Sequence, residues 1–207
     1  MDMFFEGVKK FSNQEFKKYK SLFKRLGKQQ KPHTLFIGCS DSRVVPNLIT
    51  TTLPGELFVI RNIANVVPHY RLSSEFLATT SAIEYAVLVL NVENIVVCGH
   101  SNCGGCRALF LNDEELNKIP HTKKWLELVI SAKTRVEANI SNYKNTDEIE
   151  LLVEQENIIE QMNHLLTYPF IEERYNNGKI KILGCYYEIG TGAVYNYNKE
   201  KKLFEKI

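Results

Sequence analysis

The stretch Thr34-Leu-Phe-Ile-Gly-Cys39-Ser-Asp-Ser-Arg43 decides the fold, because a short apolar run passes directly into a reactive polar turn. The same design returns in Ile95-Val-Val-Cys-Gly-His100-Ser-Asn-Cys103-Gly-Gly. Apolar runs of this length and composition are typical of buried strands in a parallel sheet. Open α/β sheets place their sites at the carboxyl ends of the strands, so the two polar turns are predicted to lie at that edge.

The two turns together supply a donor set for a metal ion. Cys39, His100 and Cys103 offer two thiolates and an imidazole, which suit Zn²⁺ and leave a fourth position for water, as in catalytic zinc sites. Taken singly, a cysteine after a buried strand is more often a small buried hydrophobe. A lone histidine there is more often a hydrogen-bonded loop residue. The combination favours one zinc ion per chain.

The remaining cysteines are predicted to be structural. Cys103 and Cys106 form a C-x-x-C pair, for which thiol redox chemistry is the alternative. A redox pair would need neither the preceding histidine nor the earlier cysteine turn, so Cys106 is expected to pack in the helix that follows. Cys98 and Cys185 lie within predicted strands and are expected to be core thiols.

Asp41 and Arg43 are predicted to form a pair beside the metal. They are two apart in an extended turn, so their side chains can project to one side. Arg43 can hold the carboxylate bidentately, which leaves Asp41 to accept a hydrogen bond from a zinc-bound water. Unpaired, Asp41 can itself occupy the fourth zinc position in a closed state. The alternative is that Asp41 caps a short helix and Arg43 is solvated.

Composition excludes several classes of function. The net charge of the 207 residues is only +2, with lysines spread among acids, so nucleic acid is not an expected partner. No basic segment followed by a long apolar one opens the chain, and no apolar run approaches membrane-spanning length, so neither a secretory signal nor a membrane partner is expected. An odd number of cysteines without such a signal favours thiols in a reducing compartment, which predicts a cytoplasmic protein.

The predicted elements alternate between strand and helix, so the fold class is α/β. Strands are expected over 34–38, 57–60, 95–99, 180–187 and 193–197. Helices are expected over 46–49, 74–90 (with Phe76 and Leu88 on its apolar side), 106–111, from 145 or 146 onward, and from 168 to 176. Gly190-Thr-Gly192 has hairpin turn chemistry, so the last strand is expected to be antiparallel and at an edge. The prediction is one domain, 1–207, with four parallel strands, an antiparallel edge strand and flanking helices.

Residues 1–27 are predicted to form an N-terminal helical arm. Apolar residues recur at helical spacing over 3–26, with Ser12 or Asn13 as a break and Gly27 near the end. So many aromatic residues need a burial partner, either on the same domain or on a partner subunit. The second arrangement is favoured.

Cys39-x-Asp41-x-Arg43 with His100-x-x-Cys103 resembles the β-class carbonic anhydrases. The likeness runs over about 31–110, weakens over 112–166 and returns in the closing strands; Pro54-Gly-Glu56 and Arg61-Asn-Ile-Ala-Asn65 are further matching blocks. It implies reversible hydration of CO₂ to bicarbonate and a proton by attack of a zinc-bound hydroxide. It also implies a homodimer or a dimer of dimers, joined partly by swapped N-terminal helices.

The resemblance also assigns roles by matching position. It implies that Cys39, His100 and Cys103 are the zinc ligands and that Asp41 and Arg43 are a carboxylate–guanidinium dyad. It also implies that the backbone N–H of Gly104 faces the substrate oxygen.

The resemblance further implies a substrate pocket made of Gln30, Phe58 and Tyr85. From the residues alone, these three would be placed in a linker, a core strand and a core helix.

Two features of the family are less complete in this chain. Some members carry a regulatory bicarbonate pocket made of Trp, Arg and Tyr, and here Phe36 stands at the Trp position beside Arg61 and Tyr187. Phe has no indole N–H donor, so no strong bicarbonate inhibition is expected. Regeneration of the active site also needs a proton carrier, for which the candidates are His33, His69, His121 and His164, with His69 slightly favoured.

The sequence is also compatible with two other functions. One is a hydrolase of the same fold that acts on CS₂ or COS. The other is a non-catalytic, zinc-stabilised binding module, in which Asp41 would fill the fourth position permanently.

Overall fold

The computed structural model describes residues 2–73, 75–138 and 145–207. It divides into two compact units, Met1–Lys31 and Pro32–Ile207. The first unit contains the predicted arm and extends to Lys31 rather than ending at residue 27. No helix in the described part of the chain combines the length and the apolar character that a bilayer span requires.

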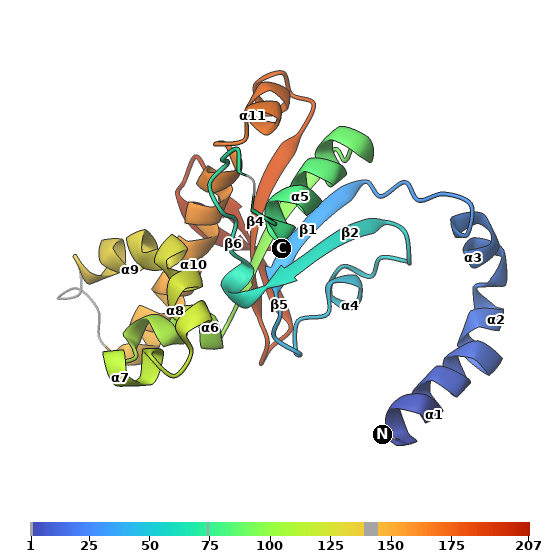
Figure 1. The fold of residues 1–207 in the computed structure, drawn as a ribbon, viewed down its shortest axis with the longest axis horizontal. Coiled ribbons are helices and arrows are strands. Elements are labelled where there is room, and N and C mark those ends of the chain that lie inside the picture. The colour runs from blue at the N-terminus through green and yellow to red at the C-terminus, as the bar shows by residue number, and fades with distance from the viewer. Residues whose placement is uncertain (1, 74, 139–144) are drawn as a thin grey trace. The chain divides into compact units, whose positions relative to one another are not determined.

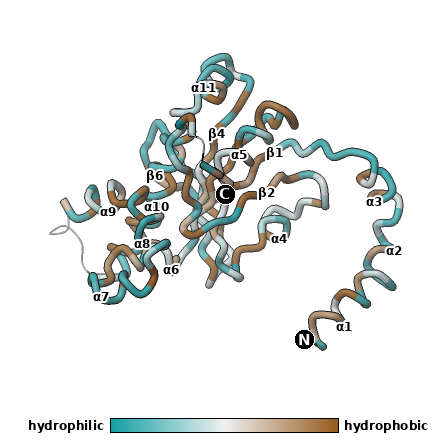
Figure 2. Tube along the Cα trace, viewed as in Figure 1, coloured by the Kyte–Doolittle hydropathy of each residue, from teal (hydrophilic) through white to brown (hydrophobic). Residues whose placement is uncertain are grey.

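The first unit is a run of helical segments: α1 (Asp2–Lys10), a π-helical turn (Phe11–Glu15), α2 (Phe16–Lys18) and α3 (Lys20–Leu26). The predicted break at Ser12 or Asn13 is wrong, since both residues lie within the π-helical turn and the helical dihedrals break at Tyr19 instead. The reason is a cluster of aromatic rings across these segments, in which Phe16 and Phe23 stack with centroids 5.3 Å apart. No described residue of this unit is buried, and apolar positions recur along it in Figure 2.

The second unit is built on one six-stranded sheet in the order β2-β1-β3-β4-β5-β6 (Figure 1). In that order the strands are Leu57–Asn62, Thr34–Cys39, Asn94–His100, Lys181–Glu188, Ala193–Asn198 and Leu203–Lys206. The first four are parallel and the last two antiparallel, so the predicted class is confirmed. The expectation that 193–197 is the edge strand is wrong, because Asn198 accepts hydrogen bonds from the Glu200 and Lys201 amides and turns the chain into β6.

The helices that flank the sheet are mostly short. They are α4 (Pro46–Thr50), α5 (Ala78–Glu84), α6 (Gly104–Arg107), α7 (Asp113–Leu116), α8 (Pro120–Leu126), α9 (Ile130–Glu137), α10 (Thr146–Leu165) and α11 (Pro169–Asn176). A π-helical segment, Tyr85–Val89, continues α5, and 3₁₀ turns cover Ile63–Asn65, Ala108–Phe110 and Glu127–Val129. The Asn145 side chain accepts from the Glu148 amide, so the predicted start of α10 is confirmed.

The helix predicted over 74–90 begins late. Ser74 lies outside the described residues, and α5 starts at Ala78. Before it, the Glu75 amide donates to Ser73 Oγ and the Glu75 carboxylate pairs with Arg71, so the Glu75 N–H is not used in a helix. Phe76 is therefore fully exposed rather than on an apolar helix face.

The two faces of the sheet are covered differently. On one face, strand residues pack with α5, α10 and α11 into the main core, and these strands carry hydrophobic colours in Figure 2. Helix α10 lies close to the strands because Gly99 and Gly184 have no side chain; a Cβ at either would lie less than 3.0 Å from the Ile158 side chain. On the other face, Phe36, Cys98 and Cys185 help to line a cavity of about 630 Å³ beside α4.

Candidate metal centre

The predicted ligands lie at the carboxyl ends of two neighbouring strands. Strand β1 ends at Cys39 and strand β3 at His100, and the strands run parallel with Gly38 opposite Cys98. After β3, Asn102 adopts a left-handed conformation (φ 56°), which turns the chain so that Cys103 stands at the N-cap of α6. The topology therefore brings both polar turns to one edge, as the sequence predicts.

At this edge the three side chains converge. The two sulfur atoms and the imidazole nitrogen all lie within 4.8 Å of one another, and the Sγ atoms of Cys39 and Cys103 are 4.0 Å apart. All three residues are buried, with His100 fully inaccessible. Among the described residues, no other group of three histidine, cysteine or acidic side chains converges in this way.

His100 provides a test of whether a metal fits. Its Nδ1 lies 3.0 Å from the Ser101 carbonyl, which can only accept, so Nδ1 carries the proton and Nε2 keeps its lone pair. Nε2 is buried and has no hydrogen-bond partner. An orphaned buried nitrogen costs free energy, and coordination of a cation removes that cost.

The two thiols need a positive charge beside them to ionise. The Cys103 thiol and burial raise the pKa of Cys39 to about 12. The Cys106 thiol and burial likewise raise the pKa of Cys103 to about 12. Two adjacent buried thiols ionise only beside a compensating positive charge, and a coordinated Zn²⁺ deprotonates them outright. The Cys₂His set fits zinc.

Asp41 and Arg43 form the predicted bidentate pair. Arg43 donates from Nε to Oδ1 at 2.9 Å and from Nη2 to Oδ2 at 2.7 Å, and its backbone N–H donates to Oδ1. The alternative that Asp41 caps α4 is wrong, because Val45 is the N-cap of that helix and has no side-chain cap. These hydrogen bonds hold the pKa of Asp41 well below its usual range. Asp41 Oδ2 is 4.0 Å from His100 Nε2, so the pair adjoins the metal ligands.

Arg61 supports the first turn from the adjacent strand. Its Nε donates to the Cys39 carbonyl at 2.9 Å and its Nη2 to the Asp41 carbonyl at 2.6 Å. The guanidinium is therefore engaged with the ligand turn. This leaves it with fewer free donors for the anion pocket in which Phe36 replaces Trp.

The substrate-pocket residues implied by the resemblance are not all in the unit that holds the ligands. The rings of Phe58 and Tyr85 lie together, with centroids 6.0 Å apart. Phe58 is opposite Leu35 on β1, however, four positions before Cys39, which places it roughly 13 Å along the sheet from the metal edge. Gln30 belongs to the first unit. Gly104 directly follows Cys103, and a Cβ there would meet nothing within 4 Å, so the space beside its Cα is open.

Three of the four candidate proton carriers are grouped around His69, and His33 is separate from them. His33 bonds Thr34 at the amino end of β1, which is the end away from Cys39. His69 and His121 line a cavity of about 400 Å³. His164 is buried, with its ring nitrogens against the Val67 carbonyl and Glu160, and its ring centroid is 3.8 Å from that of His69.

The other thiols are largely interior. Cys106 and Cys98 are buried, and the Asn157 amide donates to Cys106 Sγ at 3.8 Å. Cys185 is only partly buried and, like Cys98, borders the cavity on the less covered face of the sheet. Cys106 is thus a packed thiol, as predicted.

The sequence interpretation missed a row of buried polar side chains on α10. Glu154 accepts from the Cys103 amide at 2.7 Å, Asn157 donates to the Ala64 carbonyl, and Gln161 accepts from the Val67 amide. With His164 these residues recur at helical spacing, so they occupy one face. A signal was present, since polar residues replace apolar ones on the helix face that packs on the sheet.

A family model described as carbonic anhydrase matches residues 34–194. The chain is 42% identical to a carbonic anhydrase of Helicobacter pylori over 98% of this chain and 93% of that one. It is 39% identical to a carbonic anhydrase of Synechococcus elongatus over 91% of this chain and 68% of that one.

Solved structures give the same result. The β-carbonic anhydrase CcaA superimposes with a TM-score of 0.94 at 36% identity, covering 100% of this chain and 99% of that one. One of two tetrameric β-carbonic anhydrases from the ascomycete Sordaria macrospora superimposes with a TM-score of 0.77 at 30% identity, covering 95% and 97% of the two chains.

Proposed function

The chain belongs to the β-class carbonic anhydrases, enzymes that hydrate CO₂ to bicarbonate on zinc, and we propose that Asp41, Arg43 and the Gly104 amide assist the reaction beside Cys39, His100 and Cys103. One observation carries the proposal. The buried Cys–His–Cys cluster has an orphaned histidine nitrogen directly beside a bidentate carboxylate–guanidinium pair.

Each residue has a distinct task. Zinc, when bound, lowers the pKa of water so that a nucleophile exists near neutral pH. Arg43 occupies both oxygens of Asp41 and so holds it off the fourth ligand position, while the remaining lone pairs can accept a hydrogen bond from the reacting water. The Gly104 N–H, at the start of α6 directly after Cys103, can donate to the substrate oxygen on which negative charge develops. Because Asp41 is paired with Arg43, the structure favours a catalytic site with an open fourth position over a non-catalytic module in which Asp41 fills that position.

The substrate pocket is proposed to be completed by a second copy of the chain. Phe58 and Tyr85 lie together, and the strand register places Phe58 roughly 13 Å along the sheet from Cys39 of its own chain. A homodimer or a dimer of dimers would allow these aromatics, and Gln30 of the arm, to line the site of a neighbouring copy. The tetrameric relatives and the exposed aromatic residues of the arm support this assembly.

A cytoplasmic location is part of the proposal. All five cysteines are free thiols, as expected in a reducing compartment.

Stopped-flow hydration of CO₂, run beside COS and CS₂ with zinc-loaded and chelator-treated protein, tests the activity. We expect fast, zinc-dependent turnover of CO₂. Preferential turnover of COS or CS₂ would instead identify a hydrolase.

Mixed subunits test the shared pocket. A chain with His100→Ala, mixed with a chain carrying Phe58→Ala and Tyr85→Ala, should regain activity, because the mixed dimer contains one site with intact zinc ligands and intact aromatics. Recovery should be absent when either variant is assayed alone. Failure of the mixture to regain activity, despite mixed dimers seen by mass spectrometry, would place the aromatics in another role.

A further inference from the structure

The second ligand turn, His100–Gly105, is held by residues from outside it. Arg43 Nη2 donates to the Asn102 carbonyl at 3.0 Å, and Arg107 Nη2 donates to Asn102 Oδ1 at 3.3 Å. Cys103 is the N-cap of α6 and makes no side-chain cap hydrogen bond. Its backbone N–H instead donates to Glu154 Oε1 at 2.7 Å, across 51 residues of sequence. The conformation of this turn therefore depends on a residue of α10.

Glu154 is held on both sides. Its other oxygen, Oε2, accepts from the Tyr186 hydroxyl at 2.8 Å, and only 3% of the residue is exposed. No cation forms an ion pair with it among the described residues. An unpaired buried carboxylate is costly to fold, so its retention beside a ligand turn calls for a role.

Close packing of α10 brings this carboxylate into reach. A Cβ on Gly99, the residue before His100, would lie 3.6 Å from the Glu154 carbonyl oxygen and 2.8 Å from the Ile158 side chain. The backbone of α10 thus rests directly on β3 at the point where that strand delivers the metal ligand. Glu154 is fixed by the helix, by Tyr186 on β4 and by the Cys103 amide.

We propose that Glu154 is a positioning residue of the metal centre. It sets the Cys103 turn, and with it the Gly104 amide, in the conformation that binds zinc. The inference rests on the proposed zinc site and deepens it. Partners of metal ligands of this kind are typically worth 10–100-fold in metal affinity or activity.

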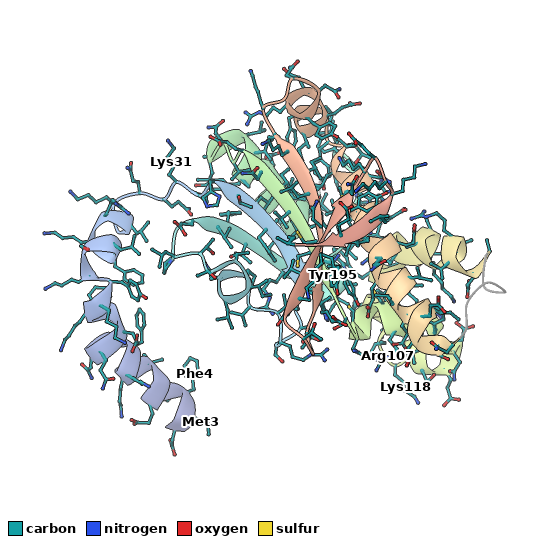
Figure 3. The ribbon with its side chains drawn as sticks, turned by 180° about the vertical axis from the view of Figure 1, so that it is seen from behind. Met3, Phe4, Lys31, Arg107, Lys118 and Tyr195 are labelled. Carbon is teal, nitrogen blue, oxygen red and sulfur yellow. The ribbon has the colours of Figure 1, made fainter. Side chains whose placement is uncertain are left out.

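The test compares four variants of the full-length protein. Glu154→Ala removes both hydrogen bonds, Glu154→Gln keeps an oxygen acceptor for the Cys103 amide, and Tyr186→Phe frees only the second oxygen. Glu150→Gln is the matched control, one turn earlier on α10, where the carboxylate pairs with Arg107, labelled in Figure 3. The readouts are the rate of zinc release to a chromophoric chelator and the thiolate-to-cobalt absorption of the Co²⁺-substituted protein.

We expect Glu154→Ala to release zinc roughly 10–100-fold faster and to shift the cobalt band. Glu154→Gln should recover most of the wild-type rate, and Glu150→Gln should match the wild type in both readouts. A Glu154→Ala protein with wild-type zinc release and an unchanged cobalt spectrum overturns the proposal, even if its melting temperature falls.

If the Glu154→Ala protein does not fold, the Tyr186→Phe protein tests the proposal instead. Zinc release faster by about threefold or more supports the proposal, and an unchanged rate overturns it. Wild-type protein in the same assays separates failure of the proposed function from failure of the role of Glu154. If the wild type binds no zinc, the proposed function fails. If the wild type binds zinc and the Glu154 variants release it at the wild-type rate, only the role of Glu154 fails.

Discussion

The two ligand turns differ in where their support comes from. Around the first, Asp41 and Arg43 bind each other within the turn, and Arg61 reaches in from the adjacent strand, largely at the surface. Around the second, Arg43 and Arg107 donate to Asn102, and a buried carboxylate on a distant helix accepts from the Cys103 amide. The first turn therefore contains its own ion pair, whereas every one of these contacts to the second turn comes from outside it. Exposed ion pairs contribute little to stability, so the value of the Asp41–Arg43 pair lies in orientation.

The largest effect is expected from loss of a metal ligand in either turn, because both turns are needed to hold the metal. Cys39→Ser, His100→Ala and Cys103→Ser should each remove most of the zinc and lower kcat/KM by at least about 100-fold. Cys106→Ser is the control and should keep both the zinc and the rate, since Cys106 contacts Cys103 but is not one of the three convergent side chains. Metal analysis beside stopped-flow rates checks this; stoichiometric zinc in any ligand variant would exclude that residue from the ligand set.

The next effect breaks the Asp41–Arg43 pair of the first turn, and Arg43→Ala also removes a hydrogen bond to the Asn102 carbonyl of the second turn. Arg43→Ala should keep zinc but lower turnover by roughly 100-fold, because Asp41 loses the partner that holds it off the fourth position. A crystal structure should show an Asp41 oxygen at bonding distance from the metal. Asp41→Ala should also keep zinc and lose rate, with water in that position.

Arg107→Ala is the matched control for the first turn, as it removes another half-exposed arginine from an ion pair near the second turn. It should leave the rate nearly unchanged. An Arg43→Ala enzyme with full activity and a remote Asp41 would mean that the pair is not a gate.

A smaller effect concerns the arm rather than either turn. Removal of residues 1–26 should weaken the dimer and lower activity, since the aromatic residues of the arm need burial and Gln30 would lose its anchor. Sedimentation velocity across a concentration series measures the dimer. An intact dimer of full activity would exclude the swapped arm.

The smallest effect is expected from bicarbonate. Inhibition should be simple and non-cooperative, because Phe36 offers no donor and Arg61 already bonds the Cys39 and Asp41 carbonyls. Rate measurements over a bicarbonate series decide it. Cooperative inhibition that disappears in Phe36→Ala would show a working regulatory pocket.

The contrast between the turns also explains which features could be predicted from the sequence. The strand ends and the Asp41–Arg43 pair are signalled by neighbours along the chain, and parallel strands bring the distant residues Cys39 and His100 to one sheet edge, where the structure shows them to converge with Cys103. Glu154 could not be assigned, because a helix pattern does not show which strand or turn the helix will meet.

Other misses have the same origin. Strand β6 depends on an asparagine-based turn in a polar stretch with little strand signal. The separation of Phe58 from the metal edge follows only from the register of β2 against β1. Both are properties of pairing, which periodicity does not fix.

The span between Cys103 and Glu154 has a consequence for the growing chain. During synthesis all three metal ligands leave the ribosome well before α10 does, and domains generally consolidate only once their distant contacts are available. A nascent chain ending before residue 146 would carry every ligand yet lack the helix that fixes the second turn. Stable loading of the metal is therefore a late event, coupled to completion of the chain.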